Sequence, residues 1–254
     1  MIRSDFHVHT CFCDGRDSPE EIVLTAISLG MKKLGFSGHA HTPFDEEACM
    51  SVDETRSYVD EIFRLKAKYA GKIEILCGTE QDYYSDTATN SYDYVIGSVH
   101  YVEIGGKYFS VDDTPEILEA GIRACGGDEY VLSERYFALV SDVVNRTGAD
   151  IIGHFDLITK FGRIDEDNPR YIDAALSAAD TLLKTGKPFE INTGAISRGY
   201  KSFPYPSLRI LKYIAERGGS VILSSDSHSK NTLMFKFTEY EAMAESLGLK
   251  VIEL

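Results

Sequence analysis

The sequence predicts an α/β fold in which parallel strands alternate with helices and close into one barrel. About seven short apolar strands are separated, nearly all of them, by longer helical stretches, which is the pattern of a parallel sheet. No glycine-rich phosphate fingerprint follows the first strand, and polar residues follow strands along the whole chain. Both observations favour a closed or distorted barrel over an open doubly wound sheet. A length of 254 residues without a linker-like stretch fits a single domain over residues 1–254.

The elements before residue 100 follow from apolar patterns and helix-start signals. A strand is predicted at residues 2–8, where polar and apolar side chains alternate. A helix is predicted at 18–29, because Ser18 offers an N-cap, Pro19 fits the first helical position and two glutamates follow. The other elements expected here are a strand at 33–37, a helix at 52–69, and strands at 74–78 and 94–98.

An insertion is predicted after the fourth strand. Gly105 and Gly106 at the centre of residues 102–109 indicate a β-hairpin, and helical character follows over 114–147. The alternation then resumes with strands at 150–153, 188–192 and 220–224 and helices at 169–184, 206–217 and 239–247.

Composition limits the partners and the location. The net charge of −14 repels nucleic acid and anionic membranes, so neither is expected as a partner. A phosphorylated substrate would need local positive charge from metals, arginines or helix N-termini. Five cysteines without a framework spacing, and an N-terminus without an apolar signal region, predict a cytoplasmic protein with reduced thiols. The oligomeric state is left open.

All seven histidines lie at or just past the end of a predicted strand. In a parallel barrel these strand ends gather on one face, where active sites are found. Random placement would put some of them in helices, so their positions predict a functional site on that face. They are His7, His9, His39, His41, His100, His154 and His228.

The segment Asp5–His9 indicates how a metal ion could be bound. Side chains alternate across a strand, so Asp5, His7 and His9 are expected to face the barrel interior, with Phe6 and Val8 packing against the surrounding helices. Two imidazoles one residue apart can bind one ion, and a carboxylate can fix a tautomer. A lone histidine is more often no ligand at all.

Other predicted strand ends supply further nitrogen and oxygen ligands: Asp14, His39, Glu80, His100, His154, Asp226 and His228. Such a mixture suits zinc, manganese or ferrous iron and does not suit calcium. One ion cannot use the whole set, so two or three ions and a bridging carboxylate are expected. Cys11 and Cys13 lie close by in sequence, but a single Cys-x-Cys more often gives partly buried thiols than a zinc site.

Six short motifs together resemble those of the PHP (polymerase and histidinol phosphatase) superfamily, and within it those of the monofunctional histidinol-phosphate phosphatases. They span residues 5–228 and read DFHVHT, SGHAH, GTE, GSVH, GH and SDSH. The resemblance implies a distorted (β/α)7 barrel with a trinuclear metal centre. Many relatives have a histidine where Asp14 stands, and an aspartate is a competent ligand there.

The resemblance also implies an assignment of ligands to ions. One ion would be bound by His7, His9, Glu80 and Asp226. A second would share Glu80 and take His100 and His154. A third would be bound by Asp14, His39 and His228.

The activity that this resemblance implies is hydrolysis of a phosphate monoester, L-histidinol phosphate in particular. A hydroxide bridging two ions would attack phosphorus, with Glu80 and Asp226 as catalytic residues, and Arg163 and Arg198 would grip the phosphate oxygens. His41 would protonate the leaving alkoxide, bind phosphate or orient a neighbouring residue. The insertion at 101–127 would wall the pocket, with three acids that could read the organic end of the substrate: Glu103, Asp112 and Asp113.

Three other kinds of function are compatible with parts of the same sequence pattern. Another PHP phosphoesterase could act on phosphotyrosine or nucleoside phosphates, whereas a nuclease would need a basic track that this acidic chain lacks. A non-catalytic PHP scaffold would be expected to have lost ligands. An amidohydrolase on a related barrel would need a strand lysine, and no predicted strand places one suitably.

Overall fold

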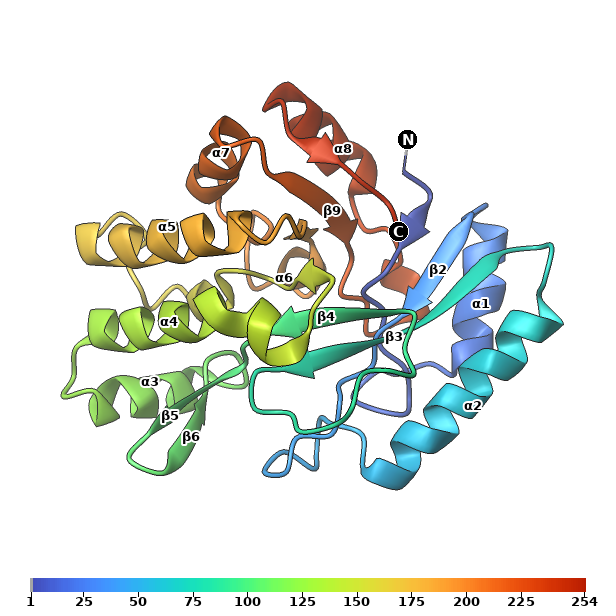
Figure 1. The fold of residues 1–254 in the computed structure, drawn as a ribbon, viewed down its shortest axis with the longest axis horizontal. Coiled ribbons are helices and arrows are strands. Elements are labelled where there is room, and N and C mark those ends of the chain that lie inside the picture. Colours follow the sequence, from blue (N-terminus) through green and yellow to red (C-terminus); the bar gives the residue numbers. More distant parts are fainter. Residues whose placement is uncertain (1) are drawn as a thin grey trace.

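A curled parallel sheet, covered on its outside by helices, forms the centre of the molecule (Figure 1). The computed structural model describes residues 2–254, and within them eight strands pair in the order β1-β2-β3-β4-β7-β8-β9-β10. These strands are β1 Ser4–Asp5, β2 Lys33–Phe36, β3 Glu74–Asp82, β4 Tyr94–Ser98, β7 Ile151–Ile152, β8 Phe189–Asn192, β9 Ser220–Ser224 and β10 Lys250–Val251. The predicted α/β barrel is confirmed, and β10 is a strand that the sequence reading missed.

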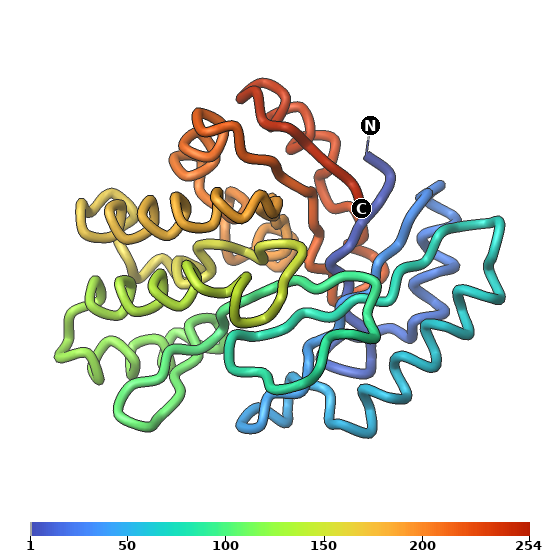
Figure 2. Tube along the Cα trace, in the orientation of Figure 1, coloured from blue at the N-terminus to red at the C-terminus, as the bar shows by residue number. Residues whose placement is uncertain are grey.

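The ring of strands closes where the chain continues beyond β1 and β9. Val8 and Ser227 form a parallel bridge, in which the amide of His9 donates to the Ser227 carbonyl at 2.9 Å and the Ser227 amide donates to the His7 carbonyl at 3.0 Å. At the opposite end of this seam, β10 pairs with β9, and Ser4 contacts Glu253. Residues 250–254 therefore lie beside the start of the chain, as Figure 2 also shows.

Helices pack around the outer face of the ring. Two of them begin with a complete capping box, formed by Ser18 with Glu21 and by Ser51 with Glu54. These and the other helices of the outer layer are α1 Pro19–Ser28, α2 Val52–Lys68, α4 Glu129–Thr147, α5 Pro169–Leu183, α7 Leu208–Glu216 and α8 Phe237–Ser246. Among the described residues, no helix combines the length and the apolar character needed to cross a membrane.

The first strand differs from its prediction. Regular pairing ends at Asp5, and beyond it the Phe6 carbonyl accepts a hydrogen bond from the hydroxyl of Tyr94 at 2.5 Å. Phe6 packs beside Tyr94 inside the ring, whereas Val8 packs in the cluster under α1 and α2. The expectation that Phe6 and Val8 face the helices together was therefore wrong.

Asp5 does not share a face with the two histidines either. Its carboxylate accepts the amides of Ser225 at 3.1 Å and Met234 at 3.0 Å, so it anchors the segment that follows β9. Burial raises the pKa of Asp5 to about 6, although these hydrogen bonds act in the opposite direction.

The insertion after β4 forms a hairpin and two helices. β5 (Tyr101–Ile104) and β6 (Lys107–Ser110) pair antiparallel around Gly105 and Gly106, whose φ angles of 61° and 80° suit the tight turn. The predicted helical region at 114–147 is divided into α3 (Pro115–Ala124) and α4 by Gly126 and Gly127, which have φ of 79° and 83°. Short helical turns that the sequence reading missed are η1 Leu157–Thr159, α6 Gly194–Ser197 and η2 Lys230–Thr232.

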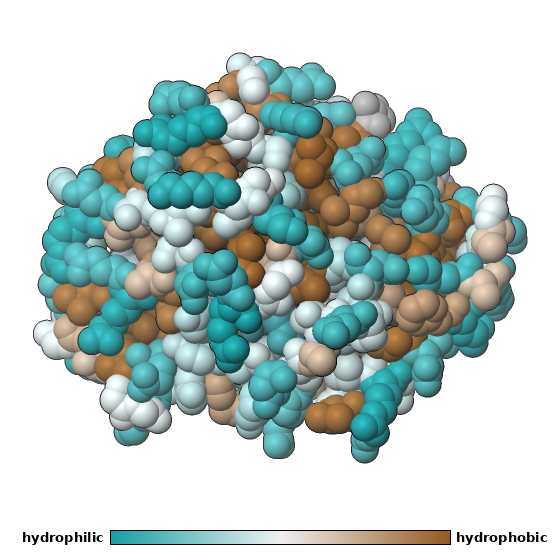
Figure 3. Space-filling model, viewed as in Figure 1, coloured by the Kyte–Doolittle hydropathy of each residue, from teal (hydrophilic) through white to brown (hydrophobic). Residues whose placement is uncertain are grey.

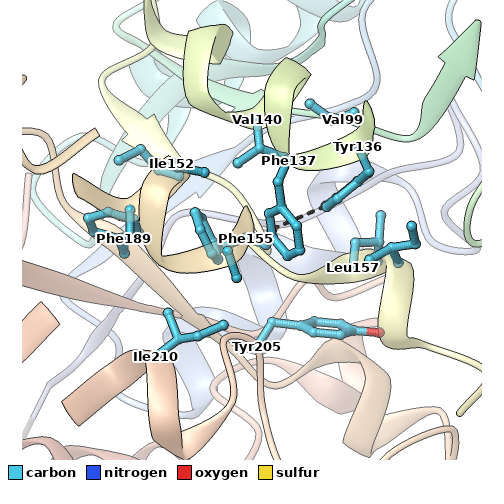
Figure 4. Packing of buried hydrophobic residues seen from close by; sticks show 14 of the residues in the cluster. Val99, Tyr136, Phe137, Val140, Ile152, Phe155, Leu157, Phe189, Tyr205 and Ile210 are labelled. Carbon is cyan, nitrogen blue, oxygen red and sulfur yellow. Dashed lines mark hydrogen bonds between the residues drawn. The ribbon is translucent and has the colours of Figure 1, made fainter. Parts of the chain in front are cut away.

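The largest hydrophobic cluster lies between the β7–β9 side of the ring and helices α4, α5 and α7. Figure 4 shows Phe137, Phe155 and Phe189 in this cluster, with the Tyr136 hydroxyl donating to the Phe155 carbonyl at 3.2 Å. Hydrophilic side chains cover much of the molecular face in Figure 3, with smaller hydrophobic areas between them. Packing of this cluster against the helices thus holds β7, β8 and β9 in place, and the polar residues described next follow or lie in these and the other strands.

Candidate metal centre

The predicted metal ligands all lie in one cluster at the carboxyl end of the sheet. His7, His9 and Asp14 follow β1, and Glu80 lies within β3. His39, His100 and His154 follow β2, β4 and β7, and Asp226 and His228 follow β9. Ligand atoms within 4.8 Å of one another form three overlapping groups: His9, Asp14, His39 and His228; His7, His9 and Asp226; and His39, Glu80 and His100.

Glu80 and Asp226 both approach the imidazoles of His7 and His9. Glu80 Oε2 lies 3.1 Å from His7 Nε2 and 3.5 Å from His9 Nε2. Asp226 Oδ1 lies 3.8 Å from His7 Nε2 and 3.4 Å from His9 Nε2. Nitrogen and oxygen ligands at normal zinc distances are about 3.4 Å apart in a tetrahedron. The four nitrogen–oxygen separations are therefore close to those around one ion.

The hydrogen-bond pattern at these atoms also fits a metal ion. His7 Nε2, His9 Nε2 and Glu80 Oε2 are buried and have no hydrogen-bond partner within the described residues. Buried polar atoms almost always have a partner, because leaving one unpaired is costly. Three such atoms facing one another indicate a bound cation at this place.

Glu80 lies between two groups of ligands. Its Oε1 is 2.8 Å from His154 Nε2 and 3.3 Å from His100 Nε2, whereas its Oε2 faces His7 and His9. The Ser98 hydroxyl donates to Oε1 at 2.6 Å and fixes the carboxylate plane. This placement allows Glu80 to bridge two ions.

A third group surrounds Asp14, whose side chain is about one-third exposed. Asp14 Oδ2 lies 2.9 Å from His228 Nε2, and Asp14 Oδ1 lies 3.7 Å from His39 Nε2. His9 Nδ1 is 3.5 Å from the same Oδ1. The other nitrogen of His39 lies 3.0 Å from Glu80 Oε2, so the His39 ring stands between this group and the bridging carboxylate.

Two carboxylates that the sequence reading did not assign to the site hold imidazoles in place. Glu190 Oε1 is 2.7 Å from His7 Nδ1, and its Oε2 accepts the His154 amide at 2.9 Å. Asp82 Oδ2 is 3.2 Å from His100 Nδ1. Carboxylates of this kind fix the tautomer and the direction of a ligating imidazole. The available signal was strand alternation, since Asp82 lies two residues after Glu80 and Glu190 lies in a predicted strand.

The ionisation of the cluster reflects strong coupling between histidines and acids. Burial opposes protonation of His7, but the carboxylates of Glu190, Glu80 and Asp226 raise its pKa well above the usual value. Burial and the neighbouring His228 and His39 lower the pKa of His9 to about 3. Burial alone would raise the pKa of Glu80, yet the surrounding imidazoles hold it well below its usual range. Glu80 is therefore ionised and ready to bind a cation.

Of the residues predicted to bind phosphate, the structure brings only Arg198 to the cluster. Arg198 Nη2 donates to Asp226 Oδ2 at 3.0 Å, and its side chain remains 29% exposed. Arg163 is exposed and does not line the cavity over the centre. His41 does not line it either, and its Nδ1 lies 3.3 Å from Asp86. A cation that the sequence reading missed, Lys160, does line the cavity and donates to the Asp112 carbonyl at 2.6 Å.

A cavity of about 480 Å³ extends outward from the cluster. Asp112 and Asp113 line this cavity as expected, but Glu103 does not. Burial and the nearby Asp14 raise the pKa of the Cys13 thiol to about 12, and Cys11 is exposed. A thiol that keeps its proton is a poor metal ligand, which agrees with leaving both cysteines out of the ligand set.

Comparison with known proteins places this arrangement in one family. The model of the PHP domain matches residues 5–194. The Deinococcus radiodurans protein named "Probable histidinol-phosphatase" is 32% identical over 98% of this chain and 95% of its own length. The Bacillus subtilis protein named histidinol-phosphatase is 25% identical over 96% of this chain and 99% of its own.

A solved structure shares the fold. The crystal structure of histidinol phosphate phosphatase from Lactococcus lactis subsp. lactis, complexed with zinc, L-histidinol and phosphate, has a TM-score of 0.71 and 22% identity. The match covers 98% of this chain and 95% of that one. Since the family model matches most of the chain and the Deinococcus relative is similar along nearly all of it, this chain belongs to the PHP domain family.

Proposed function

We propose that this chain is a metal-dependent phosphatase that hydrolyses L-histidinol phosphate to L-histidinol and inorganic phosphate. The observation that carries the proposal is the set of buried, unpartnered ligand atoms of His7, His9 and Glu80, which face one another below an open cavity. The names of the relatives that match along nearly the whole chain support the choice of substrate. The domain that performs the reaction is taken to comprise residues 1–254.

Two or three divalent ions, zinc, manganese or ferrous iron, fit the ligand types and their spacing. The sets proposed for them are those that the PHP resemblance implies. His7, His9, Glu80 and Asp226 form one set, supported by the four nitrogen–oxygen separations described above. Glu80, His100 and His154 form the second set, and Asp14, His39 and His228 form the third.

Metal ions bound at such a site lower the pKa of a coordinated water and neutralise charge on the transferred phosphoryl group. Residues of the chain would bind the phosphate and orient the metal ligands. Arg198 and Lys160 line the cavity as cations and can donate hydrogen bonds to phosphate oxygens. Glu190 and Asp82 keep the imidazoles of His7 and His100 pointed at the centre. Neither Arg163 nor His41 has a part in this proposal, because both lie outside the cavity lining.

The cavity volume of about 480 Å³ suits a small phosphate monoester as the partner. A cytoplasmic location is proposed as well, supported by five cysteines that are all free thiols in the structure.

The test is a phosphate-release assay on protein stripped with a chelator and reloaded with manganese or zinc. Reloaded protein should release phosphate from L-histidinol phosphate much faster than from p-nitrophenyl phosphate, and stripped protein should release little from either. Equal rates on both esters would remove the substrate assignment. No metal-dependent phosphate release from either ester, or from a panel of sugar and nucleotide phosphates, would remove the phosphatase assignment itself.

A further inference from the structure

The cavity has two chemically different ends. The inner end contains the ligand cluster, together with Arg198 and Lys160. The outer end is formed by two segments far apart in sequence, residues 42–49 after β2 and the insertion that begins with β5. Side chains lining this outer end are Phe44, Asp45, Glu47, Tyr101, Tyr108 and Asp113. Three of these six are acids and three are aromatic.

The two segments meet through a pair of stacked rings. The rings of Phe44 and Tyr108 are parallel to within 7° and have centroids 3.8 Å apart. Tyr84 contacts both rings edge-on, at 6.1 Å from Phe44 and 5.0 Å from Tyr108. Phe44 nevertheless remains 38% exposed and Tyr108 43% exposed. A fixed aromatic wall that is still open to the cavity suits a planar or cationic group of a ligand.

Asp45 adds a carboxylate beside this wall in a fixed orientation. The Tyr101 hydroxyl donates to Asp45 Oδ2, and the Ala48 amide donates to Asp45 Oδ1 at 3.2 Å. No lysine or arginine among residues 2–254 forms an ion pair with Asp45, whereas Asp112 is 3.2 Å from Lys160. The Asp45 charge is thus held in the cavity wall without a cationic partner from the protein.

The outer end adjoins the inner one through Tyr101. Tyr101 follows His100, and the centroids of their rings are 6.3 Å apart. The Phe44 ring contacts the Tyr101 ring edge-on at 5.0 Å. Tyr101 therefore lies between the metal end and Phe44, and its hydroxyl contacts Asp45. L-histidinol phosphate has a phosphate at one end and an imidazole and an ammonium group on a short carbon chain, so its two kinds of group match the two ends of the cavity.

We propose that Phe44, Asp45 and Tyr108 form a specificity subsite that selects phosphate monoesters with a positively charged organic half. The inference rests on the proposed phosphatase function, and it assigns recognition chiefly to the segment after β2 rather than to the insertion alone. Asp45 receives the cationic group, and the aromatic pair contacts the ring. The carboxylates at the outer end, of Asp45, Glu47 and Asp113, disfavour esters with an anionic tail, such as nucleotides and sugar bisphosphates, because like charges repel.

The test compares two esters on the metal-loaded protein and its Asp45→Asn variant. Asparagine keeps an oxygen that can accept the Tyr101 hydroxyl but removes the charge. The ratio of kcat/KM for L-histidinol phosphate to that for p-nitrophenyl phosphate should fall at least about tenfold, mainly through KM, as expected for losing a charge-assisted contact. Glu46→Gln is the matched control, since Glu46 is an exposed acid next in sequence that does not line the cavity. It should leave the ratio unchanged.

A binding measurement keeps the test decisive if the variant protein is less active overall. L-histidinol should inhibit Asp45→Asn and Phe44→Leu more weakly than it inhibits the parent, while inhibition by inorganic phosphate should change less. An unchanged substrate ratio together with unchanged inhibition by L-histidinol would overturn the subsite.

Failure of the substrate assignment would look different. If the parent protein hydrolysed another amino-alcohol phosphate better than L-histidinol phosphate, the ester named under the proposed function would be wrong. The subsite would then be tested by measuring how far Asp45→Asn lowers the ratio of kcat/KM for that ester to kcat/KM for p-nitrophenyl phosphate. A parent protein that preferred neutral or anionic esters over all cationic ones would overturn the subsite, whether or not it is a phosphatase.

Discussion

At the scale of single residues, Glu80 has the most contacts with the proposed ligands. Its two oxygens face different imidazoles, and the Ser98 hydroxyl holds its plane. Burial at 1% exposure would normally favour a neutral carboxyl, but the surrounding histidines keep its pKa low. Changing the charge of this one side chain should therefore affect more than one ion.

Replacing Glu80 by Gln should remove at least one metal ion per chain and lower phosphatase activity by about 100-fold or more, because the bridging charge is lost. Elemental analysis of the purified protein measures the metal, and a phosphate-release assay measures the activity. Glu74→Gln is a suitable control, since Glu74 lies in the same strand but is exposed and far from the cluster. Full metal content in Glu80→Gln would contradict the bridging role.

Asp156 gives a pH-dependent prediction. It is buried, its Oδ2 accepts the Ser207 amide at 2.9 Å, and its Oδ1 has no hydrogen-bond partner within the described residues. Burial raises its pKa to about 6, against the effect of the nearby Lys201. An acid with a raised folded-state pKa stabilises the fold most below its unfolded pKa and loses that contribution as pH rises through about 6.

Asp156→Asn should therefore be more stable than the parent at pH 8, by roughly 2 kcal/mol, and should lose this advantage near pH 4. Urea unfolding of chelator-treated protein at both pH values measures the difference. Asp167→Asn, at an exposed acid, should show no such dependence. An equal difference between variant and parent at both pH values would show that burial of the charge is not the cause.

At the scale of elements, α6 shows how a short helix can position the site. A Cβ on Gly194 would lie 2.7 Å from Asp226 Oδ2 and 2.9 Å from Arg198 Nη2. Asp226 already has a positive φ of 49°, so its backbone has little freedom to move aside. The close approach of α6 to the segment after β9 thus requires a glycine at this position.

Gly194→Ala should lower phosphatase activity by about tenfold or more by displacing Asp226 and Arg198. Steady-state kinetics and a thermal melt, measured together, separate this from general destabilisation. Ser197→Ala, in the same helix, removes only a bond to the Gly194 carbonyl and should change activity little. Normal activity in Gly194→Ala would mean that the two side chains have room to adjust.

Most elements and the metal cluster could be predicted, because both depend on local signals. Apolar runs and helix caps fixed the order of strands and helices, and the ends of parallel strands must meet on one face. The path of residues 5–9 could not be predicted, because it involves partners distant in sequence, such as Tyr94 for the Phe6 carbonyl and the Ser225 and Met234 amides for the Asp5 carboxylate. Arg163 looked suitable from its loop, but whether a loop side chain points into a cavity depends on tertiary packing, and Lys160 points there instead.

At the scale of the whole molecule, metal content and stability should be coupled. The cluster joins residues from both ends of the chain, and ions that bind only the folded form stabilise it. Treatment with a strong chelator should lower the melting temperature by several degrees or more, and zinc or manganese should restore it. Calcium, which prefers an all-oxygen site, serves as the control ion and should restore little. A melting temperature that did not respond to chelation would argue against structurally important ions.

Metal ions would also link the two segments that meet at the seam beyond β1 and β9. His7 and His9 lie on one side of it and Asp226 on the other, and backbone hydrogen bonds at Ser227 and from the Arg16 amide to the His228 carbonyl join the two segments. An ion bound by all three side chains would cross-link two segments that are more than 200 residues apart in sequence. Amide hydrogen exchange at His9 and Ser227 should therefore slow markedly on metal loading. The exchange rates of these two amides would then measure how fully the metal site is occupied.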